Sequence, residues 1–157
     1  MKEFIILFFA LSLISCNDGD FDVPAIEFTS DVGSCGEYLL YITNSNNTEV
    51  LILTLGPSNL GTIEGESAIQ ISSSSKNLIY RIFNEGIQDT YFCQDIPPSS
   101  PNVAKELIAE SGIINITTTE ISNGYEYSIT ISDLLFNDVD ERIFFENFSF
   151  GDFIVNP

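Results

Sequence analysis

The stretch that decides the fold is IINITTTEISNGYEYSITIS, which runs from Ile113 to Ser132. Its Asn123-Gly124 pair is the strongest short-range signal for a two-stranded hairpin. After the turn, four apolar positions alternate with four polar ones, namely Tyr125, Tyr127, Ile129 and Ile131 with Glu126, Ser128, Thr130 and Ser132. Because side chains alternate faces along a strand, this pattern gives one buried face and one wet face. We therefore predict antiparallel strands at 113–120 and 125–132.

Further β-prone runs lie on both sides of this hairpin, bounded by turn residues. They are 23–29, 36–43, 48–55, 68–72, 78–83, 90–93, 142–150 and 153–155. The runs 36–43 and 48–55 flank an Asn-rich turn at 44–47 and are apolar on both faces, which is typical of central strands in a covered sheet.

One segment carries a helical pattern. Within 102–111, Val103, Ala104, Leu107 and Ile108 share a face at helical spacing, and Gly112 can end the helix. Seven to nine short strands with this one short helix predict an all-β fold. The architecture we expect is an antiparallel β-sandwich, immunoglobulin-like, formed by a single domain over 23–157.

The N-terminus reads as an export signal. Lys2 precedes an apolar run of about eleven residues, Phe4 to Ile14, which suits a signal peptide and is too short to span a bilayer. Leu13-Ile14-Ser15-Cys16 then resembles the lipobox of bacterial lipoproteins. That resemblance implies a signal peptide at Met1–Ser15, lipidation of Cys16 and membrane attachment through its acyl chains. An acidic tether, 16–22, follows.

Composition narrows the possible functions. The net charge of −18 disfavours nucleic acid and predicts no nucleic-acid partner. The sequence contains neither His nor Trp, so Ser-His-Asp catalysis and His-ligated zinc are excluded. We expect a non-enzymatic protein without a cofactor.

Cys35 and Cys93 remain once Cys16 is assigned to the lipid. In an oxidising compartment an even pair of cysteines predicts a disulfide, and two buried free thiols are the alternative. Closing so long a loop stabilises a protein by about 4 kcal/mol in the chain-entropy model.

Three stretches, CNDGD at 16–20, TYFCQDIPPSSP at 90–101 and FENFSFGDF at 145–153, resemble small cell-envelope lipoproteins of Flavobacteria, in the Bacteroidota. The resemblance implies an envelope setting and assigns no catalytic or binding residue. Acidic residues just behind the lipidated cysteine resemble a surface-export signal in that group. We therefore expect an outer-membrane lipoprotein on the cell surface, with the periplasmic face as the alternative.

Two acidic groups are candidate metal ligands. Asp18, Asp20 and Asp22 alternate like the start of an EF-hand loop, but Val23 and Thr29 occupy the positions of its glycine and closing glutamate. The weak candidates at a second site are Asp138, Asp140 and Glu141, for which a solvated turn is the alternative. Neither group predicts a metal site.

The final strands carry an aromatic cluster: Phe144, Phe145, Phe148, Phe150 and Phe153. Core packing is the expectation, and a partner-binding patch is the alternative. The sequence as a whole predicts a lipid-anchored binding or structural module that contacts an envelope protein or a glycan. A calcium-dependent carbohydrate-binding protein or a carboxylate-based glycan-active enzyme is the alternative function.

Overall fold

The computed structural model describes residues 21–22, 27–96, 98–139 and 142–156. Its strands are β1 (Phe21–Asp22), β2 (Gly33–Cys35), β3 (Leu39–Thr43), β4 (Glu49–Thr54), β5 (Gly65–Ser72), β6 (Leu78–Phe83), β7 (Val103–Ile121), β8 (Gly124–Asn137) and β9 (Arg142–Val155). A short 3-10 helix, η1, spans Tyr91–Cys93. The fold is all-β, as predicted. No helix in the described part of the chain is long and apolar enough to cross a membrane.

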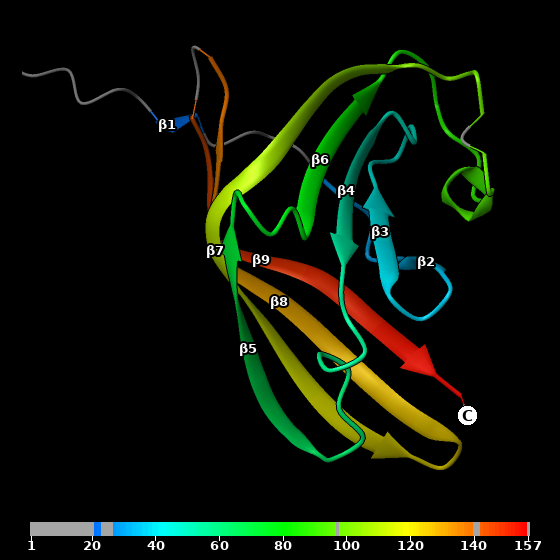
Figure 1. The fold of residues 1–157 in the computed structure, drawn as a ribbon, viewed down its shortest axis with the longest axis vertical. Coiled ribbons are helices and arrows are strands. Elements are labelled where there is room, and N and C mark those ends of the chain that lie inside the picture. Colours follow the sequence, from blue (N-terminus) through cyan, green and yellow to red (C-terminus); the bar gives the residue numbers. More distant parts are fainter. Residues whose placement is uncertain (1–20, 23–26, 97, 140–141, 157) are drawn as a thin grey trace, which may run out of the picture.

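All nine strands belong to one sheet, in the order β1-β9-β8-β7-β6-β4-β3-β2, with β5 also paired to β7. The neighbours are antiparallel except for β1, which runs parallel to β9. Figure 1 shows the sheet curled into a half-barrel, with β7 bending from the part that holds β6 and β4 into the part that holds β8 and β9. The immunoglobulin-like sandwich is not confirmed.

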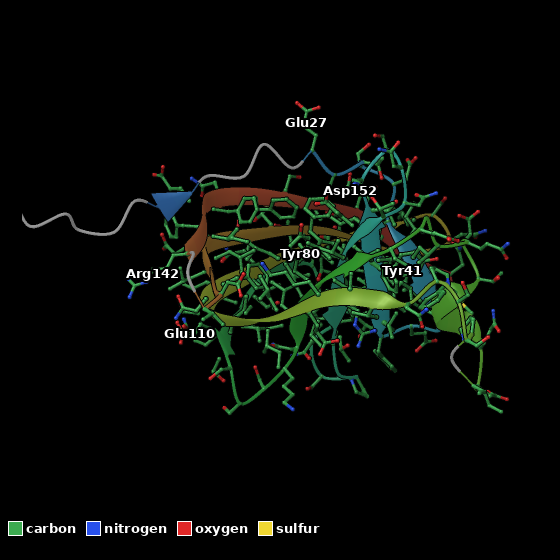
Figure 2. The ribbon with its side chains drawn as sticks, turned by 90° about the horizontal axis from the view of Figure 1, so that it is seen from above. Glu27, Tyr41, Tyr80, Glu110, Arg142 and Asp152 are labelled. Carbon is green, nitrogen blue, oxygen red and sulfur yellow. A yellow bond between two sulfur atoms is a disulfide. The ribbon has the colours of Figure 1, made fainter. Side chains whose placement is uncertain are left out.

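The main core fills the concave side of the curled sheet. Inward-facing side chains of β3, β4 and β6 meet those of β7, β8 and β9, and most are less than 3% exposed. The fully buried members include Leu40, Ile42, Leu53, Leu78, Ile114, Leu134 and Phe150. Figure 2 places Tyr80 between the two halves of the sheet.

A second hydrophobic cluster lies on the opposite face of β3 and β4. We call it the outer cluster; it consists of Tyr41, Val50, Ile52, Phe83 and Ile87, with Tyr91 and Phe92 packed against it. The loop that carries η1 covers this face. Both faces of β3 and β4 are therefore buried, as their apolar sequences predict.

Both predicted hairpins are confirmed. In the deciding stretch β7 pairs with β8 from Ile121↔Gly124 onward, and Tyr127, Ile129 and Ile131 are buried on one face. The β3–β4 hairpin turns at 44–47, where the Asn44 side-chain carbonyl accepts hydrogen bonds from the backbone N–H of Thr48 and Glu49.

The predicted helix at 102–111 is wrong, because this segment is the first half of β7. Leu107 and Ala109 are buried while Glu106 and Glu110 are exposed, which is the two-residue period of a strand. The apolar positions have helical spacing, but pairing with β6 from Ile79↔Ile108 onward overrides both this pattern and the helix propensity of Ala, Lys, Glu and Leu.

Two other predicted strands differ from the structure. The segment 90–93 forms η1 and adds no strand, because its aromatic side chains turn onto the outer cluster. Of the run 23–29, residues 23–26 lie outside the described residues, and Phe28 makes only a single bridge to Asn44. The runs 142–150 and 153–155 join into the continuous strand β9.

The bend in β7 depends on Gly112. The register with β8 shifts on both sides of Ser111, and Gly112 has a φ of +145°. A Cβ at Gly112 would lie 3.2 Å from the Cα of Leu134 and 3.1 Å from the Cδ1 of Ile71. The corner of the half-barrel therefore requires a residue without a side chain.

We expect Gly112→Ala to lower the free energy of unfolding more than Gly65→Ala does. Both glycines have a φ close to +145°, but a Cβ at Gly65 meets no atom within 4 Å. Backbone strain costs each variant about 1–3 kcal/mol, and overpacking adds about 1–3 kcal/mol to Gly112→Ala alone. Urea unfolding followed by circular dichroism measures the difference. Equal losses in the two variants would contradict the close packing at the corner.

Candidate functional site

The strongest candidate for a ligand site is a cleft of about 320 Å³ at one end of the half-barrel. We call it the tyrosine cleft. Three segments line it: the β2–β3 turn, the β4–β5 connection, and the edge formed by the start of β8 and the end of β9. Its residues are Glu37, Tyr38, Pro57, Leu60, Thr62, Tyr125, Tyr127 and Val155.

Hydrogen bonds hold these walls in place. Tyr127 is 2% exposed, and its hydroxyl donates to the carbonyl oxygen of Gly61 at 3.1 Å, which fixes the β4–β5 connection to β8. The backbone N–H of Leu55 donates to the carbonyl oxygen of Tyr38 at 2.8 Å, which fixes the β2–β3 turn to the end of β4. The walls are therefore largely preformed, as small-ligand sites usually are.

The electrostatics of the cleft combine neutral hydroxyls with one carboxylate. Burial raises the pKa of Tyr127, and the nearby Tyr125, Glu37 and Tyr38 raise it further. A hydrogen bond with Glu37 raises the pKa of Tyr38. Tyr38 and Tyr127 therefore stay protonated at neutral pH, and the partly buried Tyr38 and Tyr125 offer aromatic faces beside the carboxylate of Glu37.

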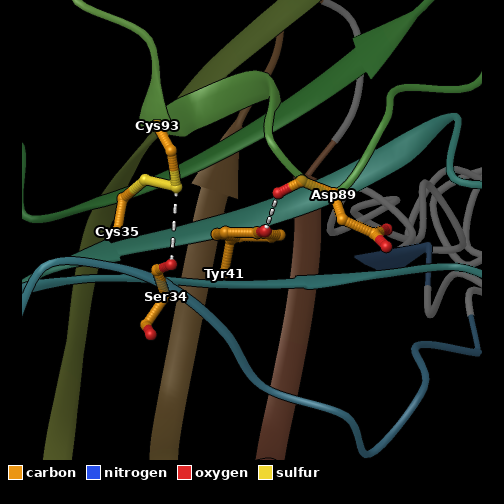
Figure 3. The surroundings of a disulfide bond; sticks show 5 residues. All are labelled: Ser34, Cys35, Tyr41, Asp89 and Cys93. Carbon is orange, nitrogen blue, oxygen red and sulfur yellow. Dashed lines mark hydrogen bonds between the residues drawn. A yellow bond between two sulfur atoms is a disulfide. The ribbon is translucent and has the colours of Figure 1, made fainter.

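A second cleft, of about 350 Å³, lies beside the outer cluster and is more polar. We call it the polar cleft; its lining includes Thr29, Asp31, Thr43, Asn47, Gln88 and Asp89. The hydroxyl of Tyr41 donates to the carbonyl oxygen of Asp89 at 2.5 Å (Figure 3). Burial, and then Asp89, raises the pKa of Tyr41.

The aromatic ring in the polar cleft is already covered. Tyr41 is 7% exposed, and its ring centroid lies 4.9 Å from that of Phe92. Its other neighbour is Gly33, where a Cβ would lie 2.4 Å from the ring. Tyr41 therefore holds the η1 loop in place and offers no free face to a ligand. This makes the tyrosine cleft the better candidate.

Cys35 and Cys93 form a disulfide, which confirms the prediction made from the two cysteines that remain after Cys16. Their Cα atoms lie 5.2 Å apart, within the usual range. The bond joins β2 to the end of η1 next to Tyr41 (Figure 3). It therefore fastens the loop that covers the outer cluster.

Replacing both cysteines by serine should lower the free energy of unfolding by about 4 kcal/mol, because the bond closes a long loop. The two cysteines are 58 residues apart. Thermal unfolding of the double variant and of the wild type, with and without reductant, measures the effect. Reductant should shift the wild type toward the variant and leave the variant unchanged. A wild type that is insensitive to complete reduction would contradict the fastening role.

Tyr80 is a buried tyrosine outside both clefts, and its hydroxyl is bonded within the sheet. Tyr80 is 5% exposed, and its hydroxyl donates to the Oε2 of Glu49 at 2.6 Å. Burial and this hydrogen bond raise the pKa of Tyr80 well above its ordinary value. The pair links β6 to β4 inside the sheet, and its role is structural.

The weak metal-ligand candidates at 138–141, for which a solvated turn is the alternative, are described only in part, since Asp140 and Glu141 lie outside the described residues. Asp138 forms an ion pair with Lys105. The contact with Lys105, and then the backbone N–H of Val139, lowers the pKa of the Asp138 carboxyl. Within the described ranges there is no group of three or more Asp, Glu, Cys or His side chains placed to hold a metal ion.

The signal peptide Met1–Ser15 and the lipidation residue Cys16 lie outside the described residues. The tether residues Asp18 and Asp20 do as well, while Asp22 is described only by its backbone pairing in β1. Lipidation and the tether therefore remain predictions from the sequence.

The aromatic cluster of β9 belongs mainly to the core. Phe150 is fully buried, and Phe145, Phe148 and Phe153 pack against the main core. Phe148 also contacts Phe28 edge-on, with ring centroids 5.7 Å apart. Core packing, the expectation from the sequence, accounts for these side chains.

Reasoning from the sequence missed the tyrosine cleft. Its members come from three segments that are far apart in the chain, and the register of the sheet brings them together. The available signals were Tyr125 and Tyr127, which share the inward face of one strand, and the Glu37-Tyr38 pair in a turn. Neither signal shows which segment faces the other.

The fold and the cleft define an all-β half-barrel domain with an aromatic, acid-bearing cleft at one end. Comparison with protein-family models, with curated proteins and with solved structures finds no match for this chain.

Proposed function

We propose that the protein is a lipid-anchored envelope protein whose half-barrel is a non-enzymatic binding module. The observation that carries the proposal is the tyrosine cleft, which offers aromatic faces, hydroxyl donors and one carboxylate in a volume of about 320 Å³. Aromatic and other hydrophobic walls with a few placed polar groups are typical of ligand sites.

The proposed cellular location is inferred from the sequence. Ser15-Cys16 ends an apolar run of signal-peptide length, and acidic residues begin directly afterwards. We place the protein in the outer membrane of a Bacteroidota-like cell, on the outer surface, with the acyl chains on Cys16 as its membrane attachment. Its partner is an envelope protein or a glycan.

The tyrosine cleft also favours a second candidate function, a calcium-dependent carbohydrate-binding protein or a glycan-active enzyme. Sugar rings pack their apolar faces on aromatic side chains and hydrogen-bond to carboxylates, and Glu37 lies beside Tyr38 in this cleft. Hydrolysis of a glycosidic bond requires a second acid across the scissile bond. Glu37 is the single acid among the residues that line the cleft, so binding is the stronger proposal.

We expect Cys16→Ser to move the protein from the membrane fraction to the soluble fraction of the expressing cells. The change removes the thiol to which the lipid is attached, and the described domain is unaffected by it. Fractionation followed by immunoblotting measures the distribution, with Cys35→Ser as the matched control. A Cys16→Ser protein that is still recovered with the membranes would count against lipid anchoring.

An array of envelope glycans and of basic, neutral and acidic peptides tests the binding function. We expect at least one class of ligand to be retained by the wild type and lost by Tyr38→Leu, which removes an aromatic face from the cleft. Glu146→Gln is the control, because Glu146 lies on β9 outside the cleft.

The same array should be probed in Ca²⁺ and in chelator. Binding that persists in chelator supports the calcium-independent module. Retention of glycans only when Ca²⁺ is present would establish the second candidate function instead. An array on which no retention depends on Tyr38 would refute the cleft as the binding site.

A further inference from the structure

We infer that the tyrosine cleft takes an arginine side chain from a basic segment of a partner protein. The inference deepens the proposed function and rests on it, since it names the chemistry of the partner for the same cleft. Three observations carry it: the aromatic lining, the placement of Glu37, and the absence of described basic residues from the end of the half-barrel that holds the cleft.

The lining suits a flat cation. Tyr38 and Tyr125, which are only partly buried, supply aromatic faces, which carry negative charge density and attract a cation placed over the ring. Glu37 supplies a carboxylate at the exposed rim. A guanidinium can stack on an aromatic ring while it donates two parallel hydrogen bonds to a carboxylate, which an ammonium cannot do.

The residues that surround the cleft are acidic. Glu120 pairs with Tyr125 across β7 and β8, and Glu126 is the next residue along β8. The carboxylate of Glu64 accepts a hydrogen bond from the backbone N–H of Glu120 at 3.2 Å, which brings the β4–β5 connection to the same end. Glu37, Glu64, Glu120 and Glu126 therefore share the end of the molecule that holds the cleft.

The basic residues of the described part lie elsewhere. Arg142 begins β9 whereas Val155, in the cleft, ends it, and Figure 2 shows Arg142 beside Glu110 at the far end of the molecule. Lys105 is paired with Asp138 beyond the end of β8, opposite Tyr125 at its start. Arg81 is paired with Glu106 on β6 and β7 at 2.6 Å.

The remaining described basic residue, Lys76, follows the end of β5 that is remote from the cleft. The lining of the cleft contains no Lys or Arg. A cation that approaches this end therefore meets attraction from several carboxylates and no fixed positive charge within the cleft. Charge complementarity thus selects a basic partner over a neutral or acidic one.

The test is calorimetric titration of the full chain, purified in a neutral detergent, with the peptide acetyl-Gly-Arg-Gly-amide. The matched probe replaces arginine by citrulline, which keeps the shape and loses the charge. We expect the citrulline peptide to bind roughly tenfold more weakly or not at all, because a charge-assisted pair becomes a neutral one. Binding of the arginine peptide should weaken as salt is raised, since salt screens exposed charges.

Variants locate the site. We expect Glu37→Gln and Tyr38→Leu each to weaken binding of the arginine peptide roughly tenfold, as loss of a charged partner or a stacked ring does. Glu146→Gln, an acid outside the cleft, should leave the affinity unchanged. Circular dichroism of each variant, compared with the wild type, confirms that the fold is retained.

Each other outcome overturns the inference. Equal affinity for arginine and citrulline peptides would remove the role of charge. Equal weakening by Glu37→Gln and Glu146→Gln would show a diffuse attraction to the acidic surface. Absence of arginine-peptide binding, together with cleft-dependent glycan binding on the array, would overturn this inference and leave the proposed binding function standing.

Discussion

The pairing of β7 along both of its edges is the constraint on which the rest of the structure depends. One edge pairs with β6 through its first half and with β5 through its second, while the other edge pairs with β8. A single strand of 19 residues thereby belongs to both halves of the sheet. Corners of this kind are made by strands that bend at bulges, and the bend in β7 brings the inner faces together over one core.

The disulfide holds in place the loop that covers the second face of β3 and β4, which is also apolar. The loop between β6 and β7 covers that face with Ile87, Tyr91 and Phe92, and it contains little regular structure of its own. Loops without pairing are weakly held, and the bond from Cys93 to Cys35 limits how far this one can open. The hydroxyl of Tyr41 adds a second attachment at Asp89.

The sequence was informative wherever a local pattern decides the structure. The turn at Asn123-Gly124 and the strand at 78–83 are predicted nearly to the residue, because alternation and turn chemistry are local, whereas β7 and β8 both extend well beyond the predicted strands. The prediction for the segment 102–111 is wrong, because its apolar residues have helical spacing and only pairing with the neighbouring β6 makes it a strand. The cysteine pairing is predicted from the even number of cysteines that remain after Cys16 and from the expectation of an oxidising compartment. The tyrosine cleft could not be predicted, because Tyr38 and Tyr127 meet only through the register of the sheet.

β1 joins the sheet at the end of β9 that is remote from the tyrosine cleft. Phe21, five residues beyond Cys16, pairs with Arg142 at the start of β9, and the cleft lies at Val155, where that strand ends. Figure 1 shows β9 curving with the sheet between these two points. An attachment made ahead of β1 would therefore leave the cleft accessible at the other end of β9.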